Sequence, residues 1–350
     1  MSSSETFSAT SERLRNYHPF AESDIDLVAN VAAVQSGMDF AGFMAYTGVP
    51  EPEIVSMDNG NTCIEVVDIK PQGDYDETKL RLRFLGTGNG LDRNQLYQIA
   101  TGVATDPTVR TVAFGNLNGL GRENPGTMTG HNIGQVFGGN LRPLIDSQLR
   151  YAAGSKRTGS KVTHVEEDGF SGGSLLAMTA GEYANSYDLS VSQITAIEPT
   201  DVKHRGKLKP MAMASLGVDF IKTGGPLPGY IAATNIPAFT EIQGGSALGY
   251  VKYGLGILRA SNLVLASNLA GDYFTERATR TLKAQPDSRL HVIWGSDSEL
   301  AHDGLMRIIM PMLKRDFRQR IGTTRIPGGK HNMVNDIHLQ AALLLHARRP

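Results

Sequence analysis

The chain contains a single cysteine, Cys63, among its 350 residues. One cysteine excludes an intrachain disulfide framework and a zinc site built from several cysteines. The chain also lacks an excess of either charge, because 34 Lys and Arg residues face 35 Asp and Glu residues. No bulk electrostatic field attracts nucleic acid or an anionic membrane surface, so we expect a small-molecule substrate and no nucleic-acid partner.

Long apolar runs are absent near the N-terminus. A membrane-spanning helix needs about 20 mostly apolar residues, whereas residues 25–49 are interrupted by Asp26, Asn30, Gln35 and Asp39. The first residues, Met-Ser-Ser-Ser-Glu, lack the basic and apolar segments of a secretory signal. We therefore expect no transmembrane segment and a protein that is cytoplasmic or otherwise not exported by the Sec route. The sequence does not fix an oligomeric state.

The N-terminal part differs in composition from the rest. Residues 1–23 are rich in Ser, Thr and Glu and poor in aliphatic side chains, so we expect an arm without a core of its own. From Asp24 onward, apolar residues recur at helical spacing, which predicts one or two helices before the turn-rich residues 58–60. We therefore assign residues 1–59 to an N-terminal arm and helical extension.

From residue 60 the pattern alternates between strands and helices. Period-two and apolar runs predict strands at 63–69, 79–85, 111–114, 161–165, 191–197, 290–294 and 323–326. Helical spacing predicts helices near 92–104, 141–153, 174–183, 305–318 and 336–346. This alternation is typical of an α/β fold whose mostly parallel sheet is flanked by helices on both faces.

The pentapeptide Gly169-Phe170-Ser171-Gly172-Gly173 stands between a predicted strand and a predicted helix. A nucleophilic serine needs a sharp turn that presents its hydroxyl, and glycines two residues away on either side let the strand and helix close around it. Ser171 is therefore the candidate nucleophile, and Gly172 offers a backbone N–H at the positive end of the helix. Three acids precede this turn, so either the strand ends at Val165 or these side chains have partners: Glu166, Glu167 and Asp168.

Three motifs resemble those of the α/β-hydrolase superfamily, in its chain order of nucleophile, acid and histidine. Residues 292–297, which end in Asp297, resemble the loop after the penultimate strand, and residues 325–332 resemble the histidine loop before the final helix. The resemblance implies an α/β-hydrolase fold in which His331 is the general base of Ser171 and Asp297 orients it. It also implies a serine hydrolase of carboxylic esters, esterase- or lipase-like, that forms an acyl-enzyme and needs no cofactor or metal.

The acid remains open between several carboxylates. The family's acid often stands three residues after the strand-end glycine, which is Ser298 here, with Asp297 one residue earlier and Glu299 one residue later. Glu198 is an alternative because some family members place the acid after the preceding strand. Asp303 is a further alternative, and His302 in the same loop is the reserve histidine.

The second oxyanion donor of the family comes from the loop after an early strand. Residues 84–90 occupy that place, and the backbones of Thr87 and then Gly88 are the candidates beside Gly172. The loop can equally be a plain strand-to-helix connection. It is not a dinucleotide fingerprint, because Leu91 stands where the third glycine is required.

The rhythm of strands and helices stops between residues 199 and 289. The superfamily commonly inserts a lid or cap there, so we assign 60–198 and 290–350 to the hydrolase core and 199–289 to a lid insertion. Its apolar residues between 248 and 269 either pack on the core or line a groove for a substrate with an apolar part. The same motifs also fit a thioesterase, a peptidase, an acyltransferase or a non-catalytic binding module.

Overall fold

The structure is a computed structural model that describes residues 2–57, 62–73, 77–86, 91–115, 135–136, 139–154, 164–200, 202, 273–331, 333 and 336–349. Within these ranges the chain forms a sheet of eight strands in the order β1-β2-β4-β3-β5-β6-β7-β8. The strands are β1 (Glu53–Met57), β2 (Thr62–Ile69), β3 (Lys79–Phe84), β4 (Arg110–Phe114), β5 (His164–Phe170), β6 (Val191–Ile197), β7 (Arg289–Gly295) and β8 (Ile321–Ile326).

The strands from β4 to β8 across the sheet are parallel, and β2 pairs antiparallel with both β1 and β4. The strand predictions within the described residues are confirmed, apart from their ends. The sequence interpretation missed β1, a short edge strand in which Ile54 is 49% exposed. Residues at such an edge bury too little apolar surface to leave an alternating pattern.

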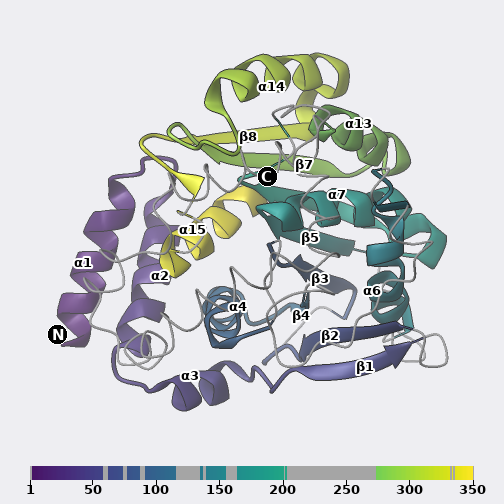
Figure 1. The fold of residues 1–350 in the computed structure, drawn as a ribbon. Coiled ribbons are helices and arrows are strands. Elements are labelled where there is room, and N and C mark those ends of the chain that lie inside the picture. Colours follow the sequence, from purple (N-terminus) through teal and green to yellow (C-terminus); the bar gives the residue numbers. More distant parts are fainter. Residues whose placement is uncertain are drawn as a thin grey trace.

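Helices cover both faces of the sheet (Figure 1). One apolar cluster joins the sheet to α6 (Arg142–Gly154), α7 (Gly172–Tyr183), α13 (Phe274–Ala284) and α14 (Asp303–Phe317). The other joins it to α1 (Ser3–Arg15), α2 (Glu22–Gln35), α3 (Phe40–Thr47), α4 (Arg93–Thr105) and α15 (Ile337–Arg348). Short 3-10 turns follow α7 at Ala184–Tyr187 and α14 at Arg318–Arg320. The predicted α/β fold class, with its mostly parallel sheet between two helical layers, is confirmed.

The expected N-terminal arm is a helix instead. Ser2 caps α1, with its hydroxyl accepting from the Glu5 backbone N–H while the Glu5 carboxylate accepts from the Ser2 N–H. This reciprocal cap satisfies two backbone donors that a helix start leaves open. Leu14 is fully buried in the cluster with α2 and α15. Packing on the core therefore orders a segment whose composition alone predicted an arm.

Part of the predicted lid lies in the core. Helix α13 packs against α7, and Phe274 and Leu282 are fully buried there. Residues 203–272, which make up most of the predicted lid, lie outside the described residues, so the lid stays a prediction. Among the described helices, none is long and apolar enough to cross a membrane.

Candidate active site

Ser171 occupies a sharp turn between β5 and α7. Its backbone has φ 53° and ψ −129°, a conformation that non-glycine residues rarely adopt. A side chain at Gly169 would place its Cβ 2.2 Å from the carbonyl oxygen of Gly173, and one at Gly173 would lie 2.2 Å from that of Phe84. Both positions therefore require glycine. The turn is anchored to the next strand, because the Ser171 N–H donates to the Ile197 carbonyl at 2.8 Å.

His331 lies beside this serine, although 160 residues separate them in the chain. Its Nε2 is 3.0 Å from the Ser171 hydroxyl oxygen, and the side chain is 6% exposed. The histidine loop is tied to the loop after β7, since the Asp297 N–H donates to the Gly329 carbonyl and the Gly328 N–H donates to the Ser296 hydroxyl. Gly295 must be glycine, because a Cβ there would lie 2.1 Å from the Gly329 carbonyl oxygen.

Glu198 provides the carboxylate on the other nitrogen of the imidazole. Its Oε2 lies 3.1 Å from His331 Nδ1, and the carboxylate is fully buried directly after β6. The Gly295 N–H donates to Oε1 at 2.5 Å and the Ser298 hydroxyl donates to Oε2. The Glu198 backbone has φ 53°, held by its N–H bond to the Ile293 carbonyl. Carboxylate, imidazole and hydroxyl thus form one chain of hydrogen bonds.

The expected place of Asp297 beside the histidine is corrected by this geometry. Asp297 is exposed, and its Oδ1 accepts from the Ser296 hydroxyl at 2.8 Å. Glu299 is also exposed. Ser298 is the buried residue of the loop after β7 and contacts Glu198, so the acids on either side of it face solvent.

Asp303 and His302 lie at the start of α14 rather than at the serine. The Asp303 carboxylate accepts from Trp294 Nε1 at 2.8 Å and from Arg325 Nε at 2.7 Å. The Arg325 hydrogen bond is the largest of the influences that hold the pKa of Asp303 below its ordinary value. Asp303 therefore ties α14 to β7 and β8. His302 precedes the helix with φ 53°.

Of the three predicted oxyanion donors, Gly172 is the one within the described residues. It is the first residue of α7, where backbone N–H groups have no partner inside the helix and the helix dipole is positive. Thr87 and Gly88 lie outside the described residues. The segment that leads to them contacts the serine turn, as the approach of Gly173 to the Phe84 and Leu85 carbonyls shows.

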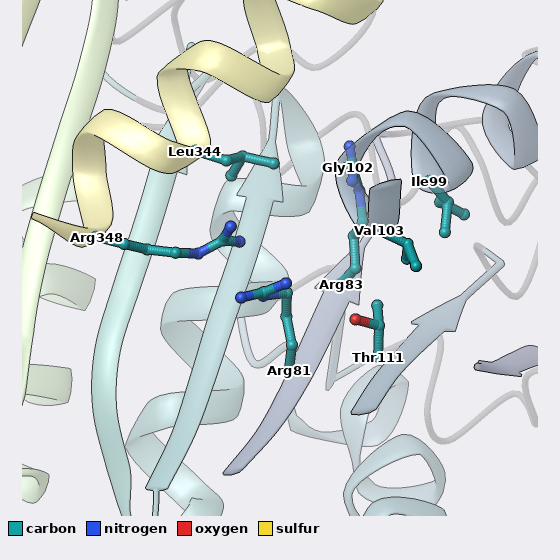
Figure 2. A pocket seen from close by; sticks show the side chains of 8 residues that line it. All are labelled: Arg81, Arg83, Ile99, Gly102, Val103, Thr111, Leu344 and Arg348. Carbon is teal, nitrogen blue, oxygen red and sulfur yellow. The ribbon is translucent and has the colours of Figure 1, made fainter. Parts of the chain in front are cut away.

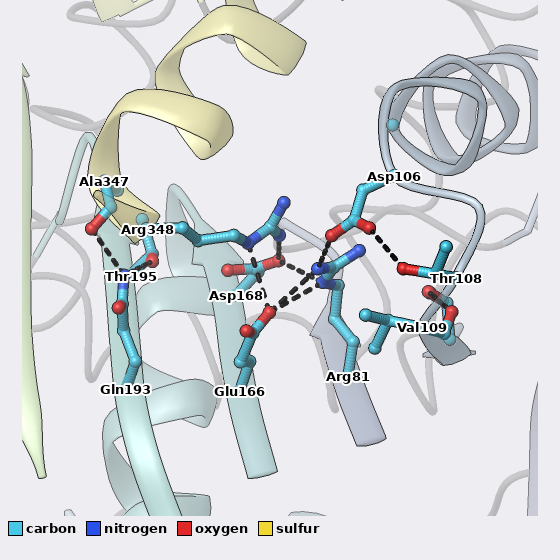
Figure 3. A network of polar contacts seen from close by, with 12 residues as sticks. Arg81, Asp106, Thr108, Val109, Glu166, Asp168, Gln193, Thr195, Ala347 and Arg348 are labelled. Atoms are coloured by element: carbon cyan, nitrogen blue, oxygen red, sulfur yellow. Dashed lines mark hydrogen bonds and ion pairs between the residues drawn. The ribbon is translucent and has the colours of Figure 1, made fainter. Parts of the chain in front are cut away.

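The acids before the serine turn remain in β5, which continues through them to Phe170. Glu166 accepts from Arg81 at 2.8 Å, and Asp168 accepts from Arg348 at 2.5 Å; Asp106 adds a further bond to Arg81 (Figure 3). The strand does not end at Val165. Arginines from β3 and α15 neutralise charges that a buried strand otherwise excludes.

The sequence predicts Glu198 only as an alternative to Asp297, because the acid of the family more often lies in the loop after the penultimate strand. The signal that favours Glu198 is an acid directly after a buried strand, Val191–Ile197, that neighbours the serine strand in a parallel sheet. The carboxyl ends of parallel strands meet at one edge. Among the described residues, no group of three or more His, Cys, Asp or Glu side chains could hold a metal ion.

Neither a family model nor a curated protein matches the chain, whereas solved structures match its fold. One is a highly thermostable carboxyl esterase from Bacillus coagulans in complex with glycerol, with a TM-score of 0.52 and 12% identity over 85% of this chain and 96% of that chain. Another is a lipase in an open form, with a TM-score of 0.50 and 15% identity over 85% of this chain and 99% of that chain. The chain therefore has the α/β-hydrolase fold.

Proposed function

We propose that the protein is a serine hydrolase that cleaves carboxylic esters, with Ser171 as nucleophile, His331 as general base and Glu198 as the acid. The observation that carries the proposal is the continuous hydrogen-bond chain from Glu198 Oε2 through the imidazole to the Ser171 hydroxyl, at 3.1 and 3.0 Å. The fold likeness to a carboxyl esterase and a lipase supports an ester as substrate.

His331 takes the proton of the Ser171 hydroxyl as the oxygen attacks the ester carbonyl, and it returns that proton to the leaving alkoxide. Glu198 accepts from Nδ1, which keeps Nε2 as the proton acceptor and stabilises the imidazolium that forms. The Gly172 N–H at the start of α7 faces the developing oxyanion, with Thr87 or Gly88 as the second donor. Water then hydrolyses the acyl-enzyme through the same base.

A fluorophosphonate probe and p-nitrophenyl esters of short and medium acyl length test this function. We expect labelling of the wild-type protein that disappears in Ser171→Ala and weakens in His331→Ala, and a kcat for ester hydrolysis that falls by about four to six orders of magnitude in either variant. Glu198→Gln should lower kcat by about three to four orders of magnitude, because the tautomer is no longer fixed.

Asp297→Asn is the matched control, since Asp297 is a carboxylate of the neighbouring loop that faces solvent. Its kcat should stay near that of the wild type. Equal losses in Glu198→Gln and Asp297→Asn would overturn the assignment of the acid. A folded wild-type protein that takes no label and cleaves no ester would contradict the enzyme and favour a non-catalytic binding module. Labelling without ester cleavage would instead direct the search to thioesters, peptides or acyl transfer.

A further inference from the structure

Three arginines surround a small cavity on the face of the sheet that α4 and α15 cover (Figure 2). Arg81 and Arg83 reach it from β3, and Arg348 reaches it from the end of α15. The cavity volume is about 10 Å³. That volume admits one water molecule or one monoatomic ion. The rest of the lining comes from Ile99, Gly102, Val103, Thr111 and Leu344.

The polar groups around this cavity are almost all donors. An arginine side chain has five N–H groups and no acceptor. Arg81 donates from Nε and Nη2 to the carboxylates of Glu166 and Asp106, and Arg348 donates from Nη2 to that of Asp168. The Nη1 group of each has no hydrogen-bond partner among the described residues.

Arg83 is the least satisfied of the three. Its Nη2 donates to the Gln340 side-chain carbonyl, and within the described residues its Nε and Nη1 have no hydrogen-bond partner. The other lining residues offer few hydrogen-bond acceptors. The Thr111 hydroxyl already donates to the Val109 carbonyl, and the Gly102 carbonyl already accepts from Thr105. A water molecule must place two hydrogens on acceptors, whereas a monoatomic anion accepts from every side and donates nothing.

Three guanidinium groups face three carboxylates in this cluster, but the carboxylates pair with Arg81 and Arg348 and not with Arg83. The side chains of Arg81 and Asp168 are each 4% exposed, whereas those of Glu166 and Asp106 are 20% and 26% exposed and partly screened by solvent. No carboxylate of the described residues lies within ion-pair distance of Arg83. Burial lowers the pKa of Arg83 to about 10 despite the nearby Asp168, and Arg348 and Arg81 act in the same direction as burial. Among the residues that the structure describes, the positive charge of Arg83 therefore lacks a direct counter-ion.

We propose that this cavity binds one monoatomic anion between the guanidinium groups of Arg81, Arg83 and Arg348, and that chloride is the ligand by size and charge. Such an ion accepts hydrogen bonds from the guanidinium N–H groups that do not donate to a carboxylate. It also joins β3, at the centre of the sheet, to the C-terminal helix α15.

Bromide is the probe for the site, because it resembles chloride in size and scatters X-rays anomalously. Crystals of the full chain grown in bromide in place of chloride should show an anomalous peak among the three guanidinium groups. Thermal unfolding in sodium chloride, against sodium gluconate at equal ionic strength, should give a Tm about 2 °C higher in chloride, since the larger anion cannot enter.

Arg83→Met should lose most of this difference in Tm between the two salts. Arg142→Met is the control, because Arg142 forms an exposed pair with Asp146 and should keep the full difference. The bromide crystals of the wild type decide the question even if Arg83→Met fails to fold. Absence of an anomalous peak in the cavity, or a salt difference that is equal in the two variants, would overturn the proposal and leave a water molecule as the occupant.

Discussion

Glu198 supplies the carboxylate beside His331, whereas the sequence pattern favours Asp297 for that place. The position three residues after the strand-end Gly295 is Ser298, and its hydroxyl donates to Glu198 Oε2. The same hydroxyl oxygen accepts from the Ala301 N–H at 3.1 Å, which fixes its direction. Ser298 therefore acts through Glu198 and is a positioning residue in the proposed mechanism.

Ser298→Ala should lower kcat about tenfold with little change in KM, because a hydrogen bond to a charged group is lost far from the bound ester. Ser298→Thr retains the hydroxyl and should recover most of the rate. Steady-state kinetics with one p-nitrophenyl ester across pH 5 to 9 provides the measurement. A wild-type kcat and pH profile in Ser298→Ala would show that the contacts with the Gly295 N–H and the His331 imidazole suffice to hold the Glu198 carboxylate.

The closeness of Ser171 and His331 could be predicted from the sequence, whereas the carboxylate that lies beside His331 could not be chosen. Ser171 carries a local steric signature, since Gly169 and Gly173 permit the close approach of β5, α7 and β3. His331 follows a Gly-Gly turn before the last helix. The choice between Asp297 and Glu198 depends on which side chain the loop after β7 buries, and burial is a tertiary property that no spacing encodes.

Helix α1 connects the N-terminal end of the chain to the histidine loop. Arg13 in α1 pairs with the Asp336 carboxylate, which also caps α15 by accepting from the Leu339 N–H at 2.8 Å. The Asp336 N–H donates to the Met333 carbonyl, two residues after His331. Arg13 therefore holds the end of the loop that carries the proposed base.

Arg13→Met should lower the Tm by about 3 °C and kcat several-fold, because it removes the guanidinium that pairs with the buried Asp336 carboxylate and so loosens the histidine loop. Arg15→Met is the matched control in the same helix, since Arg15 forms an exposed pair with Glu22 and such pairs contribute little. Thermal scans and ester kinetics on both variants make the comparison. Indistinguishable Tm and kcat values in the two variants would contradict a link between α1 and the loop.

The elements themselves were largely predictable where their own pattern is strong. The prediction for β6 matches its observed bounds, and those for α4, α6 and α15 match within two residues. The failures are segments whose structure depends on a distant partner. Helix α1 needs the surface of α2 and α15, β1 needs β2, and the acidic half of β5 needs arginines from β3 and α15.

The two faces of β5 differ in how they carry charge. Glu166 and Asp168 face the arginines under α15, whereas Glu167 lies between them on the other face, under α7. Glu167 is fully buried, and both its carboxylate oxygens have no hydrogen-bond partner among the described residues. Burial first, and the charge of Asp168 second, raise the pKa of Glu167 well above its ordinary value of 4.5.

This raised pKa makes the stability of the fold depend on pH. The folded protein retains the proton of Glu167 after the unfolded chain has released it, so the stabilising contribution is full below about pH 4.5 and is lost as pH rises toward the raised pKa. Glu167→Gln cannot titrate, so the free energy of unfolding of the wild type should fall relative to that of the variant between pH 5 and pH 8, by at most about 1.4 kcal/mol per pH unit. Urea unfolding at pH 5, 6.5 and 8 measures this difference, with Glu299→Gln as the exposed control. Parallel pH profiles of the wild type and Glu167→Gln would mean that Glu167 is ionised in the folded protein.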